Sequence, residues 1–139
     1  MKIWVIIGVI AVIAVGVGFA AQRGISYMVD EQDKVLTLAN DTATAVTANW
    51  APEDLKAFAW SDYYATLEKD GFAAWESYRL LGRRVELQNC LMLGMEITNG
   101  LGNAMAECAA TFEKGAAAIR ITVSNHTGDW RVTSFKVQL

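Results

Sequence analysis

The chain has 139 residues, of which 12 are Lys or Arg and 15 are Asp or Glu, so its formal net charge is −3 at pH 7. This length suits one domain with an appendage. All the acidic residues follow residue 29, and the basic residues form no cluster larger than Arg83-Arg84. An acidic surface repels phosphate backbones, so the composition argues against nucleic-acid binding.

The first predicted element is an uncharged segment from Ile3 to Ala21. It is rich in Ile, Val, Gly and Ala. As a helix rising about 1.5 Å per residue it would be about 28 Å long, close to the ~30 Å hydrocarbon core of a bilayer. We therefore predict a single membrane anchor and linker in residues 1–27, followed by one domain in residues 28–139.

The alternative for this segment is a cleaved signal peptide. Lys2 gives the basic start that such a peptide needs, and Gly18-Phe19-Ala20 has small residues at the cleavage positions. The apolar run exceeds the roughly 7–15 residues of a signal-peptide core, which favours a retained anchor. Lys2 lies before the segment and Arg23 after it, so the basic residues do not decide the orientation.

Three helices are predicted after the anchor. In the first, an apolar stripe at helical spacing lies opposite a polar face. The stripe comprises Val29, Leu36, Ala39, Ala43, Val46 and Trp50, and the polar face Asp33, Asn40, Asp41 and Thr47. Pro52 suits the start of a second helix, which would carry Leu55, Phe58 and Ala59 on one face and end near Ser61-Asp62. A third helix is expected from Phe72 to Leu81, with Gly82 in a left-handed cap.

From Arg83 onward the apolar residues follow a period of two, as in strands. Val85, Leu87, Leu91 and Leu93 alternate with Glu86, Gln88 and Met92, and a hairpin loop is expected at Asn99-Gly100-Leu101-Gly102-Asn103. Three more strands are expected, at Ala104 to Glu113, Ala116 to Ser124 and Trp130 to Gln138. Helices followed by strands predict an α+β fold, with three helices packed on a curled, cone-like antiparallel sheet of about four strands.

The order of these motifs resembles the nuclear transport factor 2-like (cystatin-like cone) superfamily. The likeness is carried by three helices, the stop Leu80-Leu81-Gly82, the run Ala110-Thr111-Phe112-Glu113-Lys114-Gly115 and the closing Gly128-Asp129-Trp130-Arg131-Val132-Thr133-Ser134-Phe135. It covers roughly residues 28–139. With the anchor, the chain is similar to small bacterial members held in the inner membrane by a single pass. That resemblance implies a domain facing the periplasm, whereas fold alone does not choose a function.

Eight aromatic residues lie between Trp50 and Tyr78. One interpretation is a ligand cavity in the cone, for which the candidates are Trp60, Tyr63, Tyr64, Trp75 and Tyr78. The other is that the rings form the core between helices and sheet, with Tyr hydroxyl and Trp N–H groups at its rim. Trp60 and Tyr64 are the best pocket candidates, because they lie off the face of Leu55, Phe58 and Ala59.

Catalysis on such a fold would need a buried carboxylate with a raised pKa near an oxyanion-stabilising group. Glu86 alternates with apolar neighbours as a solvent-facing residue should. Glu107 shares its strand face with Met105, Ala109 and Thr111, so it is the best acidic candidate. The single His126 belongs to a turn, and no phosphate-binding loop occurs. We therefore predict no catalytic residue, metal site or cofactor.

Cys90 and Cys108 are candidates for a disulfide in an oxidising compartment. A two-residue turn at Asn99-Gly100 would pair Thr98 with Leu101 and put the two sulfurs on opposite faces. A one-residue bulge would place Cys90 opposite Cys108 on the same face. A longer loop centred on Leu101 would separate the cysteines along the strands.

These observations predict a membrane-anchored, non-enzymatic binding or assembly domain that is a component or accessory of a membrane complex. Its partner would be another protein or a second copy of the chain. A purely structural subunit, whose membrane helix makes the main contact, fits the sequence as well. The alternative is a small-molecule-binding protein or isomerase-like enzyme that uses the interior of the cone.

Overall fold

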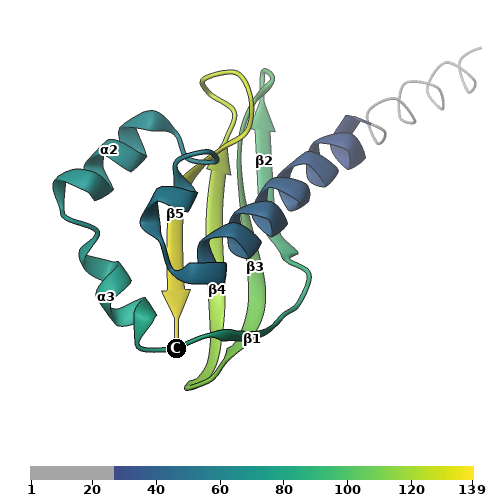
Figure 1. Ribbon diagram of the computed structural model, residues 1–139. Coiled ribbons are helices and arrows are strands. Elements are labelled where there is room, and N and C mark those ends of the chain that lie inside the picture. The colour runs from purple at the N-terminus through teal and green to yellow at the C-terminus, as the bar shows by residue number, and fades with distance from the viewer. Residues whose placement is uncertain (1–26) are drawn as a thin grey trace, which may run out of the picture. The chain divides into compact units, whose positions relative to one another are not determined.

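A computed structural model describes residues 27–139 (Figure 1). The predicted anchor, Ile3 to Ala21, lies outside the described residues and stays a prediction. Within residues 27–139, none of the helices combines the length and the apolar character needed to cross a membrane. Residues 34–139 form one compact unit, and residues 27–33 are grouped apart from it.

The first described helix, called the long helix below, covers residues 27–49. Ala39, Ala43 and Val46 are fully buried, as the apolar stripe predicts, whereas Val29 is 48% exposed. The expected polar face is wrong at Thr47, which is only 1% exposed. A polar side chain can be buried there because its hydroxyl donates to the carbonyl of Ala43 and accepts a hydrogen bond from a guanidinium.

The second predicted helix is only a short 3-10 turn, η1 (Pro52–Leu55). Its continuation leaves helical geometry because the backbone pairs with a strand instead. Val132 N–H donates to Phe58 O, and Trp60 N–H donates to Val132 O. Two α-helices follow, α2 (Ser61–Lys69) and α3 (Ala73–Arg79). Ser61-Asp62 therefore begins a helix rather than ending one, and Gly82 has the expected left-handed backbone, with φ of 78°.

The sheet has five antiparallel strands rather than about four. They are β1 (Arg84–Leu87), β2 (Leu91–Thr98), β3 (Leu101–Phe112), β4 (Gly115–Ser124) and β5 (Arg131–Gln138). β1 and β2 both pair with β3, while β4 pairs with β3 and β5. The first expected strand is thus interrupted between Leu87 and Leu91. The hairpin loop is shorter than expected, because Thr98 pairs with Leu101 directly across Asn99-Gly100.

Three bulges change which residues face the core. The register shifts between Arg84 and Glu86, between Met92 and Gly94, and between Thr122 and Val123, where the extra residue is Thr133 of β5. Each shift inserts one residue and so moves the following side chains to the other face. As a result Val85 and Leu93, the inserted residues, are exposed, and so is Leu91, which pairs with Glu107, although their period-two spacing is typical of core-facing residues.

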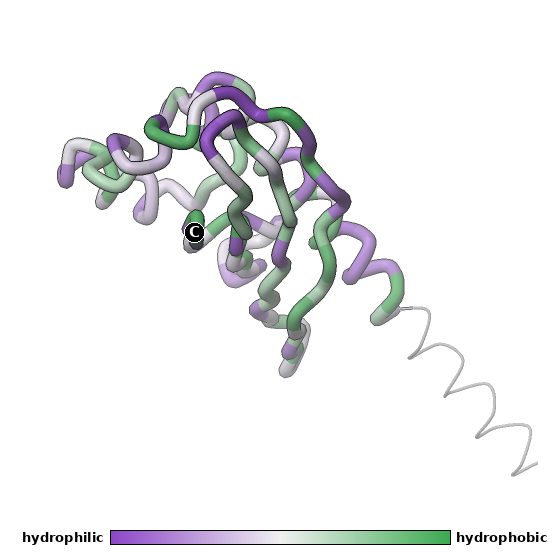
Figure 2. Tube along the Cα trace, turned by 90° about the horizontal axis from the view of Figure 1, so that it is seen from below, coloured by the Kyte–Doolittle hydropathy of each residue, from purple (hydrophilic) through white to green (hydrophobic). Residues whose placement is uncertain are grey.

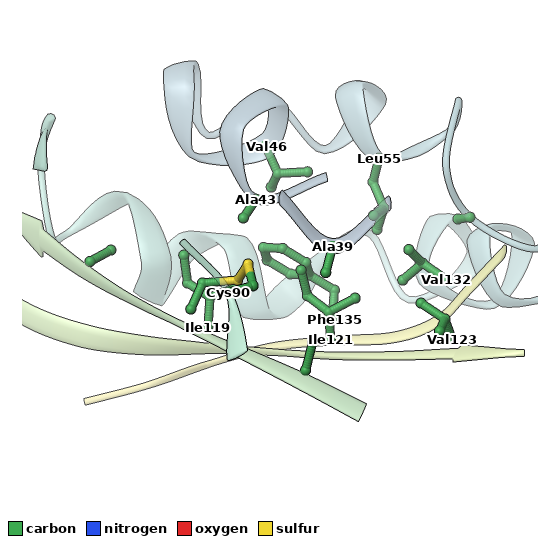
Figure 3. Packing of buried hydrophobic residues seen from close by; sticks show 14 of the residues in the cluster. Ala39, Ala43, Val46, Leu55, Cys90, Ile119, Ile121, Val123, Val132 and Phe135 are labelled. Atoms are coloured by element: carbon green, nitrogen blue, oxygen red, sulfur yellow. A yellow bond between two sulfur atoms is a disulfide. The ribbon is translucent and has the colours of Figure 1, made fainter. Parts of the chain in front are cut away.

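The core lies between the helical layer and one face of the sheet (Figure 3). The strands contribute every second residue, among them Ile119, Ile121 and Val123 of β4, all fully buried. Figure 2 colours the chain by hydropathy; hydrophobic and hydrophilic residues alternate from Ile119 to Ser124 of β4, whereas Leu91-Met92-Leu93 of β2 is apolar throughout. The opposite face of the sheet is called the outer face below. It carries the strand residues whose side chains point away from the core. The α+β fold with three helices on an antiparallel sheet is confirmed.

Candidate functional site: the outer face of the sheet

Trp75, one of the predicted pocket residues, belongs to the core. It is 1% exposed and stacks on Phe135 with a centroid separation of 5.7 Å. The rings of Phe72 and Tyr78 lie 5.9 and 5.3 Å from it. Rings at such distances add to the stabilisation that burial gives. These aromatic side chains pack α3 against β5.

Tyr63 and Tyr78 hold the strand β5 by their hydroxyl groups. Phe135 N–H donates to the Tyr63 hydroxyl at 2.9 Å, and Val137 N–H donates to the Tyr78 hydroxyl at 3.4 Å. Burial raises the pKa of Tyr63 above its ordinary value of 10.0, and the bond from Phe135 partly opposes this shift. Both hydroxyls therefore serve the fold, because they satisfy backbone groups of a strand at the edge of the sheet.

Tyr64 is also buried, at 8% exposure, and its ring centroid lies 5.5 Å from that of Phe72. The ammonium of Lys56 lies 5.8 Å from the centroid of the Tyr64 ring, a distance typical of a cation–π contact. Burial is also the main cause that raises the pKa of Tyr64. Its contacts are those of a side chain that closes the rim of the core.

Trp60 alone among the aromatic candidates is exposed, at 38%, and lines a hollow of about 220 Å³. The other lining residues have hydrogen-bonding side chains, namely Asn103, Ser124, His126, Thr127 and Thr133. Asn103 and Ser124 are paired residues on the outer face. Trp60 therefore belongs with this face rather than with the interior.

Glu107 also lies on the outer face, not in the interior. Its carboxylate accepts two hydrogen bonds from Arg120, the closer at 2.9 Å, across the β3–β4 pair. About a third of each side chain is exposed, at 33% for Glu107 and 36% for Arg120. A paired, solvent-accessible carboxylate differs from the desolvated acid that general acid–base chemistry requires.

Charges are segregated on the outer face. The acidic residues lie on one half, which β1, β2 and β3 form, and the basic residues on the other half, which β4 and β5 form. By register and burial the acidic set is Glu86, Glu96 and Glu107, and the basic set is Arg120, Arg131 and Lys136. Arg131 uses one nitrogen to donate to Ala57 O at 2.8 Å. The outer face therefore changes from negative to positive charge in the direction that crosses the strands, from β1 and β2 to β5.

The acidic half also exposes apolar side chains. Leu91 is 70% exposed and Leu93 51% exposed, and Leu93 lines a shallow hollow of about 460 Å³ with Gly94 and Met105. Exposed apolar side chains that lie together on the surface of a folded domain mark interaction surfaces. Sequence reasoning missed this patch because the bulge between Met92 and Gly94 has no local signature, apart from the glycine itself.

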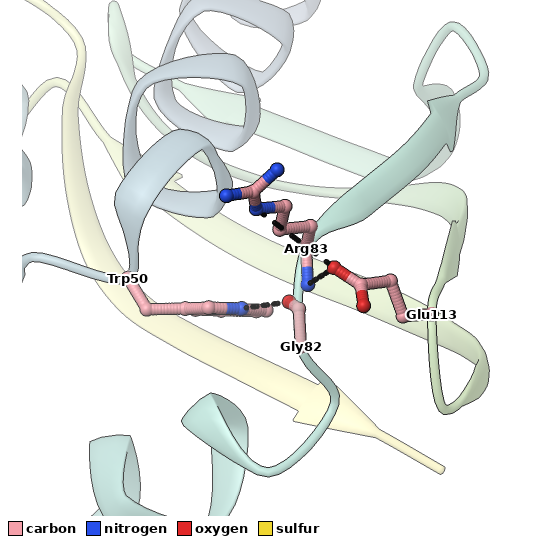
Figure 4. A network of polar contacts seen from close by, with 4 residues as sticks. All are labelled: Trp50, Gly82, Arg83 and Glu113. Carbon is pink, nitrogen blue, oxygen red and sulfur yellow. Dashed lines mark hydrogen bonds and ion pairs between the residues drawn. The ribbon is translucent and has the colours of Figure 1, made fainter.

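A polar network at the end of the long helix is structural (Figure 4). Trp50 Nε1–H donates to Gly82 O at 3.0 Å. Arg83 N–H donates to the Glu113 carboxylate at 3.1 Å, and the guanidinium of Arg83 lies 4.0 Å from the same carboxylate. These contacts join the end of the long helix to the start of β1.

Cys90 and Cys108 form a disulfide. The bulge supplies the one-residue shift that brings them opposite each other, since Leu91 pairs with Glu107. The outcome is the second of the three arrangements considered from the sequence. Asn40 of the long helix accepts a hydrogen bond from Cys90 N–H at 2.9 Å, so the disulfide lies in the core under that helix.

Within residues 27–139, no group of three or more His, Cys, Asp or Glu side chains is placed to hold a metal ion. Comparisons of the chain with protein-family models, curated proteins and solved structures gave no match. The resemblance to the nuclear transport factor 2-like superfamily therefore stays a prediction. Among the described residues, the outer face combines exposed apolar side chains with acidic residues on one half and basic residues on the other. It is therefore the candidate functional site.

Proposed function

We propose that this chain is a membrane-anchored, non-enzymatic assembly domain that binds a protein partner through the outer face of its sheet. The observation that carries the proposal is the pair of exposed leucines, Leu91 and Leu93, beside the Glu107–Arg120 ion pair. An apolar patch rimmed by charges is the usual composition of a protein-binding surface.

The contacts of the predicted pocket residues favour assembly over the alternative of a ligand in the interior. Trp75 and Tyr64 pack against other rings, and the hydroxyls of Tyr63 and Tyr78 accept backbone hydrogen bonds. Glu107, the best acidic candidate, is paired on the other side of the sheet. A catalytic interior would need these side chains for substrate rather than for packing.

The disulfide supports an exported location for the domain. Disulfides persist in oxidising compartments, including the bacterial periplasm, and are rare where thiols are kept reduced. Together with the predicted anchor, Ile3 to Ala21, the disulfide supports our proposal that the domain lies on the periplasmic side of a bacterial inner membrane. The same anchor limits the domain to partners near that bilayer.

Site-specific photo-crosslinking of the full chain in its membrane tests the proposal. A photoreactive amino acid replaces Leu93 on the outer face, and as a matched control it replaces Glu76, which is exposed on α3. We expect discrete protein adducts from position 93 and none from position 76. Adducts from position 76 alone, or no adduct from position 93 at native expression, would refute binding through this face.

A further inference from the structure

We propose that the partner on the outer face is a second copy of this chain, packed face to face about a two-fold axis that runs parallel to the strands. This inference rests on the proposed function, since it names the occupant of the same face. We infer both the partner and the direction of the axis from the pattern of charges on the outer face, not from the exposed leucines.

Strand register arranges the outer face in rows that cross the sheet. One row runs Leu91, Glu107, Arg120 and Lys136, and a second runs Glu96, Asn103, Ser124 and Arg131. In each row an acidic residue lies on β2 or β3 and a basic residue on β4 or β5. Among the strands described, the outward positions of the first half carry no base, and those of the second half carry no acid.

A two-fold axis between β3 and β4, parallel to the strands, exchanges the two halves and keeps every row at its own height. Glu107 then faces Arg120 of the second copy, and Glu96 faces Arg131 of the second copy. An axis perpendicular to the strands would instead set acidic half against acidic half. Juxtaposed like charges disfavour that arrangement, so the charges are self-complementary in one orientation only.

Side-chain size on the outer face suits the close packing of two sheets. Ala109 pairs with Ala118 near the centre of the sheet, and the proposed axis brings each opposite the other in the second copy. Sheets stacked face to face lie about 10 Å apart, which small residues permit. Leu91 meets the alkyl stem of Lys136, which can cover an apolar neighbour while its ammonium stays in water.

Charge reversal at the two ends of one row tests the axis. Within one copy, Glu96 and Arg131 lie three strand spacings apart, about 14 Å, so they interact weakly. Across the proposed interface they are in contact. E96R and R131E each place like charges opposite each other, whereas the double variant E96R/R131E restores opposite charges between the copies.

Sedimentation equilibrium of the full chain in density-matched detergent micelles measures the dimer dissociation constant. We expect each single variant to raise it at least about tenfold at low salt, and the double variant to return it to within about threefold of wild type. The control E76R changes charge on α3, away from the interface, and should leave the constant unchanged. Urea unfolding of R131E checks that losing its bond to Ala57 O leaves the domain folded.

The outcomes separate this inference from the proposed function. A chain that stays monomeric while position 93 crosslinks to a different protein overturns the second copy but keeps the assembly role. A dimer that E96R and R131E weaken without rescue in the double variant overturns the proposed axis. An effect of E76R equal to that of E96R would attribute the change to net charge and also overturn it.

Discussion

Cys90 and Cys108 are joined by a disulfide that links the residue before β2 to the middle of β3, with Cα atoms 4.0 Å apart and a sequence separation of 18. Both residues are buried, at 4% and 0% exposure. The bond closes a loop that contains all of β2, the turn Asn99-Gly100 and the first half of β3. It therefore restricts the unfolded chain in the region where the register of the sheet is set.

Removing this disulfide should destabilise the domain by about 3 kcal/mol, the loss of loop-closure entropy expected for a loop of this length. The double variant C90A/C108A avoids leaving a polar hydroxyl in the core. Guanidinium unfolding followed by circular dichroism measures the change. Reductant should lower the stability of wild type and not that of the variant. A free-thiol assay that finds two reactive cysteines in unreduced native protein would contradict the bond.

Tyr63→Phe should cost about 1–2 kcal/mol, because it leaves the Phe135 N–H without its acceptor at the edge of the sheet. Tyr64→Phe is the matched control. It removes a hydroxyl of the neighbouring buried tyrosine while keeping the ring that packs on Phe72. Urea unfolding measures the free energy of unfolding of both variants. An equal decrease in the two would show that the hydrogen bond to Tyr63 does not stabilise the domain specifically.

Stability should fall at alkaline pH partly through Tyr63. Burial raises the pKa of Tyr63 above 10.0 in the folded state, whereas the unfolded side chain ionises at about 10. The folded state thus retains the proton longer, so this contribution is complete below pH 10 and is lost as pH rises through the raised pKa. Unfolding at about pH 8 and about pH 11 should show a smaller alkaline loss in Tyr63→Phe than in wild type.

The sequence was a good guide where one local pattern decided the structure. The apolar stripe of the long helix correctly marked Ala39, Ala43 and Val46 as core, and the predicted hairpin loop contains the turn Asn99-Gly100, although the loop was expected to extend to Asn103. In both cases the signal lies within a few residues, in helical spacing or in turn chemistry. Predicting these features required no knowledge of contacts with distant parts of the chain.

Prediction failed where distant hydrogen bonds decided the structure. The segment after Leu55 carries a helical pattern, but Phe58 and Trp60 pair with Val132, more than seventy positions away. Likewise Arg84 donates to Thr47 Oγ1 and makes it possible to bury a side chain expected on the polar face. For the same reason the outer face was not predicted, since the positions of its residues depend on three bulges that only strand pairing reveals.

Gly102→Ala should destabilise the domain by about 1–3 kcal/mol, the usual cost of overpacking a close contact. A methyl group there would lie 2.8 Å from Ile97 Cγ1, 2.9 Å from the Trp130 ring and 3.0 Å from Glu96 O. Gly94→Ala is the matched control in the adjacent strand, because its added methyl would meet nothing within 4 Å. Since alanine is less costly than glycine in a strand, that variant should be neutral or slightly more stable. Thermal unfolding of both variants measures the contrast. Equal stability would mean that the β2–β3 hairpin does not pack against Trp130 as closely as described.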